Sequence, residues 1–180
     1  MVRIITLAIF VLTFAFCLPF LSRKLSRYPK VLFCFKYVIF AVYIFANLSQ
    51  TVLFRAVQPT WVNSLTLFST YRESLEYTAS QTIAVTDAKV LKNIILNVIL
   101  YIPMGYLLPF VWPKLMRVRR VSSVSRITLI GFFFSLATEL TQLVFHIGSF
   151  EADDIFNNTL GCLIGCVLYW IILRTNGVKE

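Results

Sequence analysis

Long apolar runs alternate with short polar segments along almost the whole chain. Five runs are long enough to cross the ~30 Å hydrocarbon layer of a bilayer, which takes roughly 20 helical residues. They lie at about residues 2–21, 31–54, 90–112, 127–147 and 154–173. The pattern predicts an all-α integral membrane bundle of about five transmembrane helices.

The composition supports this interpretation. Hydrophobic residues make up 58% of the chain and charged residues 14%, with a mean hydropathy of +0.79. A soluble domain of this length is far more polar. The net charge of +9 could suggest nucleic acid, but the basic residues lie between the apolar runs, where they set membrane topology. We therefore expect membrane lipids as partners and no nucleic acid.

Topology follows from the basic residues, because cytoplasmic loops are enriched in Lys and Arg. The turn at residues 22–30, the loop at 113–126 and the tail at 174–180 carry most of them and alternate to the same side. The opposite side receives the N-terminus, a long segment at 55–89 and a short acidic loop at 148–153. The sequence predicts a multi-pass protein of the plasma membrane, with its N-terminus outside and its C-terminus in the cytoplasm.

The four cysteines lie inside apolar runs, without acids or histidines at the spacings of a metal site. We expect packing roles for them, and neither metal nor cofactor. Cys17 follows Phe16 rather than the small residue that precedes a processing point, so we expect the first helix to be retained.

The long segment is too short to bury a core of its own. Within it, Trp61, Leu65, Phe68 and Leu75 recur at helical spacing, which predicts an amphipathic helix on the outer surface. Such a helix could be an interfacial anchor or a lid that grips a ligand, and aromatic residues of this kind favour the anchor.

The fourth run carries Ser135, Glu139, Gln142 and His146 at steps of four, three and four, which places them on one helical stripe. Glu139 would lie roughly 12 Å below the outer end of its helix. An ionisable group there costs about 2.5 to 3.5 kcal/mol unless it is partnered or hydrated. We expect it to face the interior of the bundle. A lone histidine at a helix end, such as His146, is typical of an interfacial hydrogen bonder.

The third run carries Asn93, Asn97 and Tyr101 at steps of four, with Gly105 continuing the stripe and Pro103 interrupting the backbone ladder. Because this helix enters from outside, both asparagines fall in its outer third.

The fifth run is predicted to begin at Asp154 as its N-cap and to continue with Asn158 on one face. Gly161 and Gly165 on the same face form a pair that allows close helix approach, either in a homodimer or within one chain. The acids around Asp154 match no calcium-loop spacing, so no metal site is predicted.

Three helices thus bring amide and acid groups to a similar depth on one side of the membrane. This convergence predicts an outward-facing polar pocket, although hydrogen bonds that join the three helices, at about 0.6 to 2 kcal/mol each, would need the same residues. The candidate ligand-binding residues are Asn93, Asn97, Ser135, Glu139, Gln142, His146, Asp154 and Asn158. Gly105, Gly161 and Gly165 are assigned to helix packing.

Three ordered motifs give the chain a family resemblance. They are NVILYIPMG at 97–105, SLATELTQ at 135–142 and DDIFNNTLG at 153–161. With them the sequence resembles the VanZ-like membrane proteins, which are associated with glycopeptide and teicoplanin resistance. The resemblance implies a VanZ-like domain at 61–173, between two N-terminal helices at 1–60 without a match and a cytoplasmic tail at 174–180.

The resemblance also implies a functional set, with one departure. The residues carried over are Asn97, Glu139, Gln142, Asp154 and Asn158. The family often carries an arginine just before its acidic stretch, where this chain has Ser149. If that arginine pairs with a carboxylate, this protein must balance its charges in another way.

Three functions are compatible with these residues. The first is binding or shielding of a lipoglycopeptide or a lipid-linked cell-wall precursor at the cell envelope, as the resemblance implies. The second is an enzyme that uses Glu139 or Asp154 on a lipid-linked substrate. The sequence leans away from an enzyme, because it has no catalytic triad pattern, phosphate-binding glycine loop or metal-spaced histidines. The third is a proton-coupled transporter, for which five helices without a repeat are a poor basis.

Overall fold

The structure is a computed structural model that describes residues 21, 24–25, 27–57, 65–68, 86–116 and 120–175. Each of its four long helices is apolar and long enough to cross a membrane. They are α2 (Pro29–Leu48), which a π-helical turn η1 (Ser49–Leu53) extends, α4 (Thr86–Val111), α5 (Arg120–Phe145) and α6 (Ala152–Thr175). A 3₁₀ turn, η2 (Pro113–Met116), follows α4. The protein is therefore an all-α membrane bundle, as predicted; the predicted first helix lies outside the described residues.

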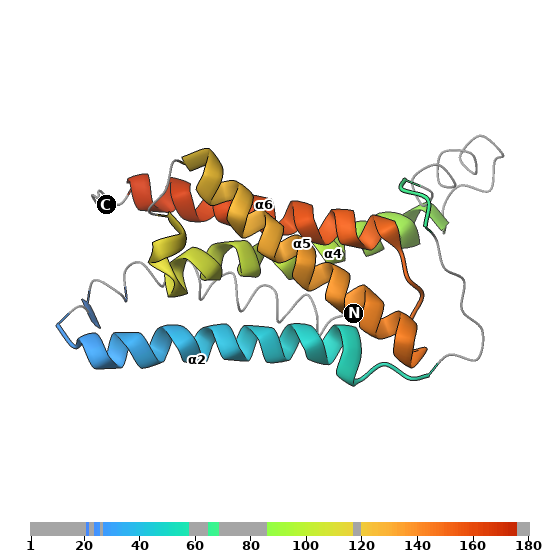
Figure 1. Ribbon diagram of the computed structural model, residues 1–180, viewed down its shortest axis with the longest axis horizontal. Coiled ribbons are helices and arrows are strands. Elements are labelled where there is room, and N and C mark those ends of the chain that lie inside the picture. Colours follow the sequence, from blue (N-terminus) through green and yellow to red (C-terminus); the bar gives the residue numbers. More distant parts are fainter. Residues whose placement is uncertain are drawn as a thin grey trace.

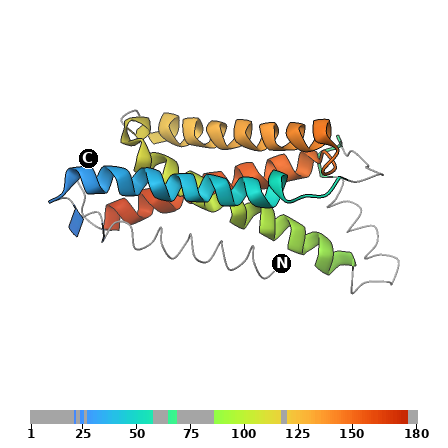
Figure 2. The same cartoon turned by 90° about the horizontal axis from the view of Figure 1, so that it is seen from below.

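The four helices lie side by side and alternate in direction (Figure 1, Figure 2). The C-termini of α2 and α5 and the N-termini of α4 and α6 share one end of the bundle. We call this the acidic end, because it carries Glu151, Asp153 and Asp154. The opposite end carries Lys30 and Lys114. The side of the membrane that each end faces remains a prediction from the charge pattern.

The largest interface in the bundle joins α4 to α6, and glycines make it possible. A Cβ atom at Gly105 would overlap the Cys162 carbonyl oxygen, and Cβ atoms at Gly161 and Gly165 would overlap backbone oxygens of α4. The two backbones are therefore in direct contact, as small residues permit in membrane proteins. The glycine face of α6 is occupied within the chain.

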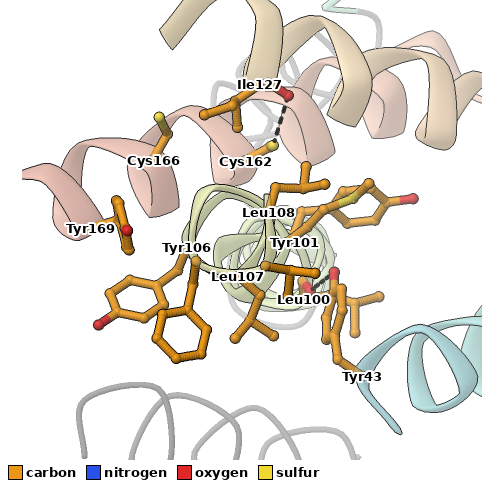
Figure 3. Close-up of a cluster of buried hydrophobic side chains, with 13 residues drawn as sticks. Tyr43, Leu100, Tyr101, Tyr106, Leu107, Leu108, Ile127, Cys162, Cys166 and Tyr169 are labelled. Atoms are coloured by element: carbon orange, nitrogen blue, oxygen red, sulfur yellow. Dashed lines mark hydrogen bonds between the residues drawn. The ribbon is translucent and has the colours of Figure 1, made fainter. Parts of the chain in front are cut away.

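Two prolines, Pro103 and Pro109, lie inside α4, yet the helix continues through both to Val111. Pro103 has no N–H to offer the carbonyl one turn before it, so the local hydrogen-bond ladder is weakened. Neighbouring helices supply partners in such places. The carbonyl that Pro103 leaves without its usual partner is that of Ile99, and next to it the Tyr43 hydroxyl of α2 donates to the Leu100 carbonyl of α4 at 3.1 Å (Figure 3).

The apolar core surrounds α4, which Figure 3 shows nearly end-on between α6 and α2. Tyr101 and Leu107 of α4 are fully buried there, together with Cys162 and Cys166 of α6. Both cysteines are free thiols. They fill small spaces beside the glycine contacts, where a larger side chain would separate the helices.

The predicted starts of two helices require correction. α5 begins at Arg120 rather than near residue 127, because its first turns are polar and a hydropathy window does not register them. α6 begins at Ala152, so Asp154 is not its N-cap but lies in its first turn. The Glu151 carbonyl accepts the N–H groups of Asp154 at 3.1 Å and Ile155 at 3.4 Å, which closes the helix earlier than predicted.

The amphipathic helix predicted for the long segment is interrupted where the structure describes it. Residues 65–68 form a turn, and Phe68 has a φ of 64°, in the left-handed region. The Phe68 N–H donates to Asp153 Oδ1 at 2.5 Å, and its ring packs on Phe156 with centroids 5.3 Å apart. These contacts hold the turn against the start of α6. The other residues of the predicted helix lie outside the described residues.

Candidate functional site

A buried carboxylate and a half-buried one occupy the centre of the acidic end. Glu139 of α5 is only 2% exposed, and its charge interacts with that of Asp154 on α6. Glu139 Oε2 accepts the backbone N–H of Glu151 at 3.2 Å. The Asn97 side chain of α4 is close enough to Asp154 to interact with its carboxylate. Three helices thus contribute one polar side chain each, which we call the outer rung.

A second set of polar side chains lies one helical turn further into the bundle. Asn158 Nδ2 donates to Ser135 Oγ at 2.9 Å, and the Tyr101 hydroxyl lies near Ser135. Each of these residues is four positions from a member of the outer rung on its own helix, which places it on the same face. We call Tyr101, Ser135 and Asn158 the inner rung, and the two rungs together the polar ladder.

Three atoms of the polar ladder are buried without a hydrogen-bond partner of good geometry. They are Asn97 Nδ2, Tyr101 Oη and Asn158 Oδ1. Tyr101 is fully buried and Asn158 is 4% exposed. Buried polar atoms are nearly always paired, and leaving one unpaired costs about 1 to 3 kcal/mol. A group from outside the chain that bonded to these atoms would recover that free energy.

Gln142 and Arg55 close the outer end of the polar ladder. Gln142 Nε2 donates to the carbonyl of Thr51, in the π-helical turn at the end of α2, at 3.0 Å. Carbonyls in the last turn of a helix lack partners within it, so this bond satisfies one of them. Arg55 Nη1 donates to Gln142 Oε1 at 3.2 Å. Gln142, predicted as a ligand residue, therefore has partners within the chain.

Arg55 is the residue that the sequence analysis missed. Its positive charge interacts favourably with both Glu139 and Asp154. Arg55 is the first residue of the predicted long segment at 55–89, and its hydrogen-bond partner is 87 positions away. One feature of the sequence could have indicated it: Arg55 directly follows a predicted membrane helix, on the side of the membrane where basic residues are otherwise few. Arg55 therefore supplies positive charge to both acids.

Two predicted ligand residues do not join the polar ladder. His146 is exposed and lies just beyond the end of α5, with a φ of 54°. Asn93 is exposed one turn outward from Asn97. Among the described residues, no group of three or more His, Cys, Asp or Glu side chains could hold a metal ion.

Gly148 leaves room for the hydrogen-bonded pair Arg55 and Gln142, which we call the cap. This gives a first prediction. A Cβ atom there would lie 2.7 Å from Arg55 Nη1 and 2.8 Å from Gln142 Oε1. Because both atoms end flexible side chains, Gly148→Ala should displace the bond between them and lower the free energy of unfolding by only about 1 kcal/mol. In thermal melts of purified protein, the loss should be absent in an Arg55→Gln background. Equal losses in both backgrounds would show that Gly148 does not act through Arg55.

Comparison with known proteins places the chain in a family. The family model described as VanZ/LLP1 matches residues 34–173. The match begins within α2 and so includes the helix that leads to Arg55, whereas the motifs alone placed the start at residue 61. No curated protein and no solved structure matches the chain. Since the family model covers well over half of the sequence, the chain belongs to the VanZ/LLP1 family.

Proposed function

We propose that the polar ladder and its Arg55–Gln142 cap form an outward-facing pocket that binds or shields a lipid-linked or lipoglycopeptide molecule at the cell envelope. The observation that carries the proposal is the group of unpartnered buried atoms beside the Glu139–Asp154 pair. Polar ligands are held by a few such groups in an otherwise apolar site. The apolar surfaces of the helices would accommodate an acyl chain.

Membership of the VanZ/LLP1 family supports a role in glycopeptide resistance, of the teicoplanin type by resemblance. The charge pattern supports an orientation in which the acidic end faces outward, since basic loops remain in the cytoplasm. A molecule at the outer leaflet would then reach the polar ladder from the side of Arg55 and Glu151.

Glu139→Gln tests this function. The variant keeps the shape of the side chain but removes its charge, so we expect resistance to a lipoglycopeptide to fall to the level of cells without the protein. The measurement is the minimal inhibitory concentration in a susceptible host, at equal amounts of protein in the membrane. Thr141→Val is a matched control on the same helix, because among the described residues the Thr141 hydroxyl donates to the Ala137 carbonyl one turn earlier in its own helix.

Unchanged resistance in the Glu139→Gln variant at equal expression would contradict the proposal. A drop of the same size in the Thr141→Val control would also count against it, because the effect would then follow from any polar loss on α5.

An enzyme is the second candidate, and the pairing of two carboxylates on adjacent helices favours it. Neighbouring acids can divide the roles of proton donor and acceptor. The test is to incubate purified protein with a labelled lipid-linked precursor and to follow its conversion. Turnover that disappears in Glu139→Gln would favour catalysis over binding, and the absence of turnover with retained binding would favour the pocket.

A further inference from the structure

We infer that the polar group taken up by the polar ladder is a protonated amine rather than a phosphate. The inference rests on the proposed function and names the chemistry of its ligand. An amine of this kind could belong to a lipid headgroup or to a lipoglycopeptide, and the experiment below separates these sources.

The charge balance around the polar ladder favours a cation. Glu139 and Asp154 interact with each other and with Glu151, and Asp153 adds to the negative charge at Asp154. Among the described residues, Arg55 is the cation whose charge acts on Glu139 and Asp154. Asp153 already accepts the Phe68 N–H. In the part of the chain that the structure describes, Glu139 accepts the Glu151 N–H and Asp154 interacts with the Asn97 side chain, which is fewer partners than the two oxygens of each carboxylate can accept. An ammonium group, with three donors and a positive charge, would complement them.

The inner rung provides an independent observation. Asn158 Oδ1 is a buried carbonyl oxygen without a partner, and the Tyr101 hydroxyl, also unpartnered, can accept a hydrogen bond. Both residues belong to helices that also carry members of the outer rung. An ammonium group between the rungs would donate to Asn158 and to a carboxylate together. A phosphate, whose oxygens accept hydrogen bonds, could take one from the Tyr101 hydroxyl but could not satisfy Asn158 Oδ1.

The start of α6 gives no compensating anion site. Helix N-termini bind phosphate through free N–H groups and a favourable dipole. Here the N–H groups of Asp154 and Ile155 already donate to the Glu151 carbonyl. The first turn also carries two carboxylates of its own, Asp153 and Asp154, which occupy the positive end of the dipole. A phosphate placed there would meet the negative charge of both carboxylates, and two of the nearby N–H groups would already be engaged.

A metal ion is a poorer fit to the same acids. The described His, Cys, Asp and Glu side chains include no set of three that could converge on one ion. An ammonium group needs only two or three acceptors at hydrogen-bond distance, without the fixed coordination that a metal demands. The amide oxygen of Asn158 and the paired carboxylates match this smaller requirement.

The experiment compares matched ligands on purified full-length protein in a neutral detergent. One arm uses phosphatidylethanolamine and its N-acetyl derivative, which lacks the charge. The other uses a lipoglycopeptide with a free amine and the same molecule after acetylation of its amines. Phosphatidic acid is the phosphate probe. Native mass spectrometry gives the lipid binding constants and thermophoresis gives those of the lipoglycopeptide.

We expect the amine form to bind roughly ten- to a hundredfold more tightly than its acetylated partner in at least one arm, as the loss of a charge-assisted hydrogen bond predicts. The arm with the difference identifies the source of the amine. Equal binding of both forms, or tighter binding of phosphatidic acid, would overturn the inference while leaving the pocket intact. If none of the probes bound, both the inference and the pocket would be wrong.

Two variants separate recognition from folding. Asn158→Ser should reduce the preference for the amine, and its melting temperature and elution profile show whether the bundle is intact. Arg55→Gln removes the competing cation, so it should bind the amine at least as tightly as the parent protein. If Arg55 instead anchored an anion, Arg55→Gln would lose binding, and that result would overturn the inference even if Asn158→Ser did not fold.

Discussion

The Gly165→Leu variant is expected to lose the folded bundle. A Cβ atom at Gly165 would overlap the Ile102 carbonyl oxygen of α4, and a leucine needs still more space. Because the obstacle is backbone rather than a flexible side chain, α4 and α6 would have to separate along their whole interface. Overpacking costs up to about 3 kcal/mol where side chains can move, so we expect at least that here. A Cβ atom at Gly161 would overlap the Val98 carbonyl oxygen in the same way, so we expect Gly161→Leu to lose the folded bundle as well.

The measurement is the yield of monodisperse protein in mild detergent and its thermal melt. Val167→Leu is the matched control, because Val167 lies on α6 two residues further along and is 40% exposed. This control should behave like the parent protein. A normal melt for Gly165→Leu would show that the helices pack at a greater distance than described.

A second large effect is expected from Arg55→Glu. The change removes the hydrogen bond to Gln142 and adds a negative charge where Glu139 and Asp154 already repel each other. Losing a hydrogen bond to a charged group costs about 1.5 to 3 kcal/mol, and because Arg55 is exposed, solvent screening places its loss at or below the lower end of that range. The added repulsion acts in the same direction. The melting temperature should fall by on the order of 5 °C.

Arg55→Gln serves as the control for this prediction, because it removes the charge and the hydrogen bond to Gln142 without adding an acid. Its melting temperature should fall by less than half as much. Combining Arg55→Glu with Glu139→Gln should recover part of the loss, since one repulsive pair is removed. If Arg55→Glu and Arg55→Gln had the same melting temperature, the charge at position 55 would not affect the stability of the site.

Much of this fold follows from hydropathy alone, because a bilayer requires long apolar helices. The predicted runs at 31–54 and 90–112 correspond closely to α2 with η1 and to α4. The errors lie at polar ends. The start of α5 has three serines and an arginine among its first residues, and this polarity concealed a helix that hydrogen bonding nonetheless extends to Arg120. The start of α6 depends on the Glu151 carbonyl, which no periodicity reveals.

The site was only partly predictable for a related reason. Steps of three and four placed Ser135 with Glu139 and Asp154 with Asn158 on common faces, because those relations are local to one helix. Which faces meet depends on how helices pack. The partnership of Arg55 with Gln142 joins residues 87 positions apart and could not be predicted from spacing. The same packing gave Gln142 a capping bond to Thr51.

The helix that delivers Arg55 is also the least enclosed of the four. Only 17% of the membrane-crossing stretch of α2 is buried, against 56% for α4. Few described hydrogen bonds join this helix and the residues directly after it to the other helices. Tyr43 bonds to the Leu100 carbonyl, and Gln142 bonds to both Thr51 and Arg55. The electrostatic balance of the two acids thus depends on the least buried of the four described helices. A change in lipid thickness or composition that tilted this member would alter the acids' environment without touching either of them.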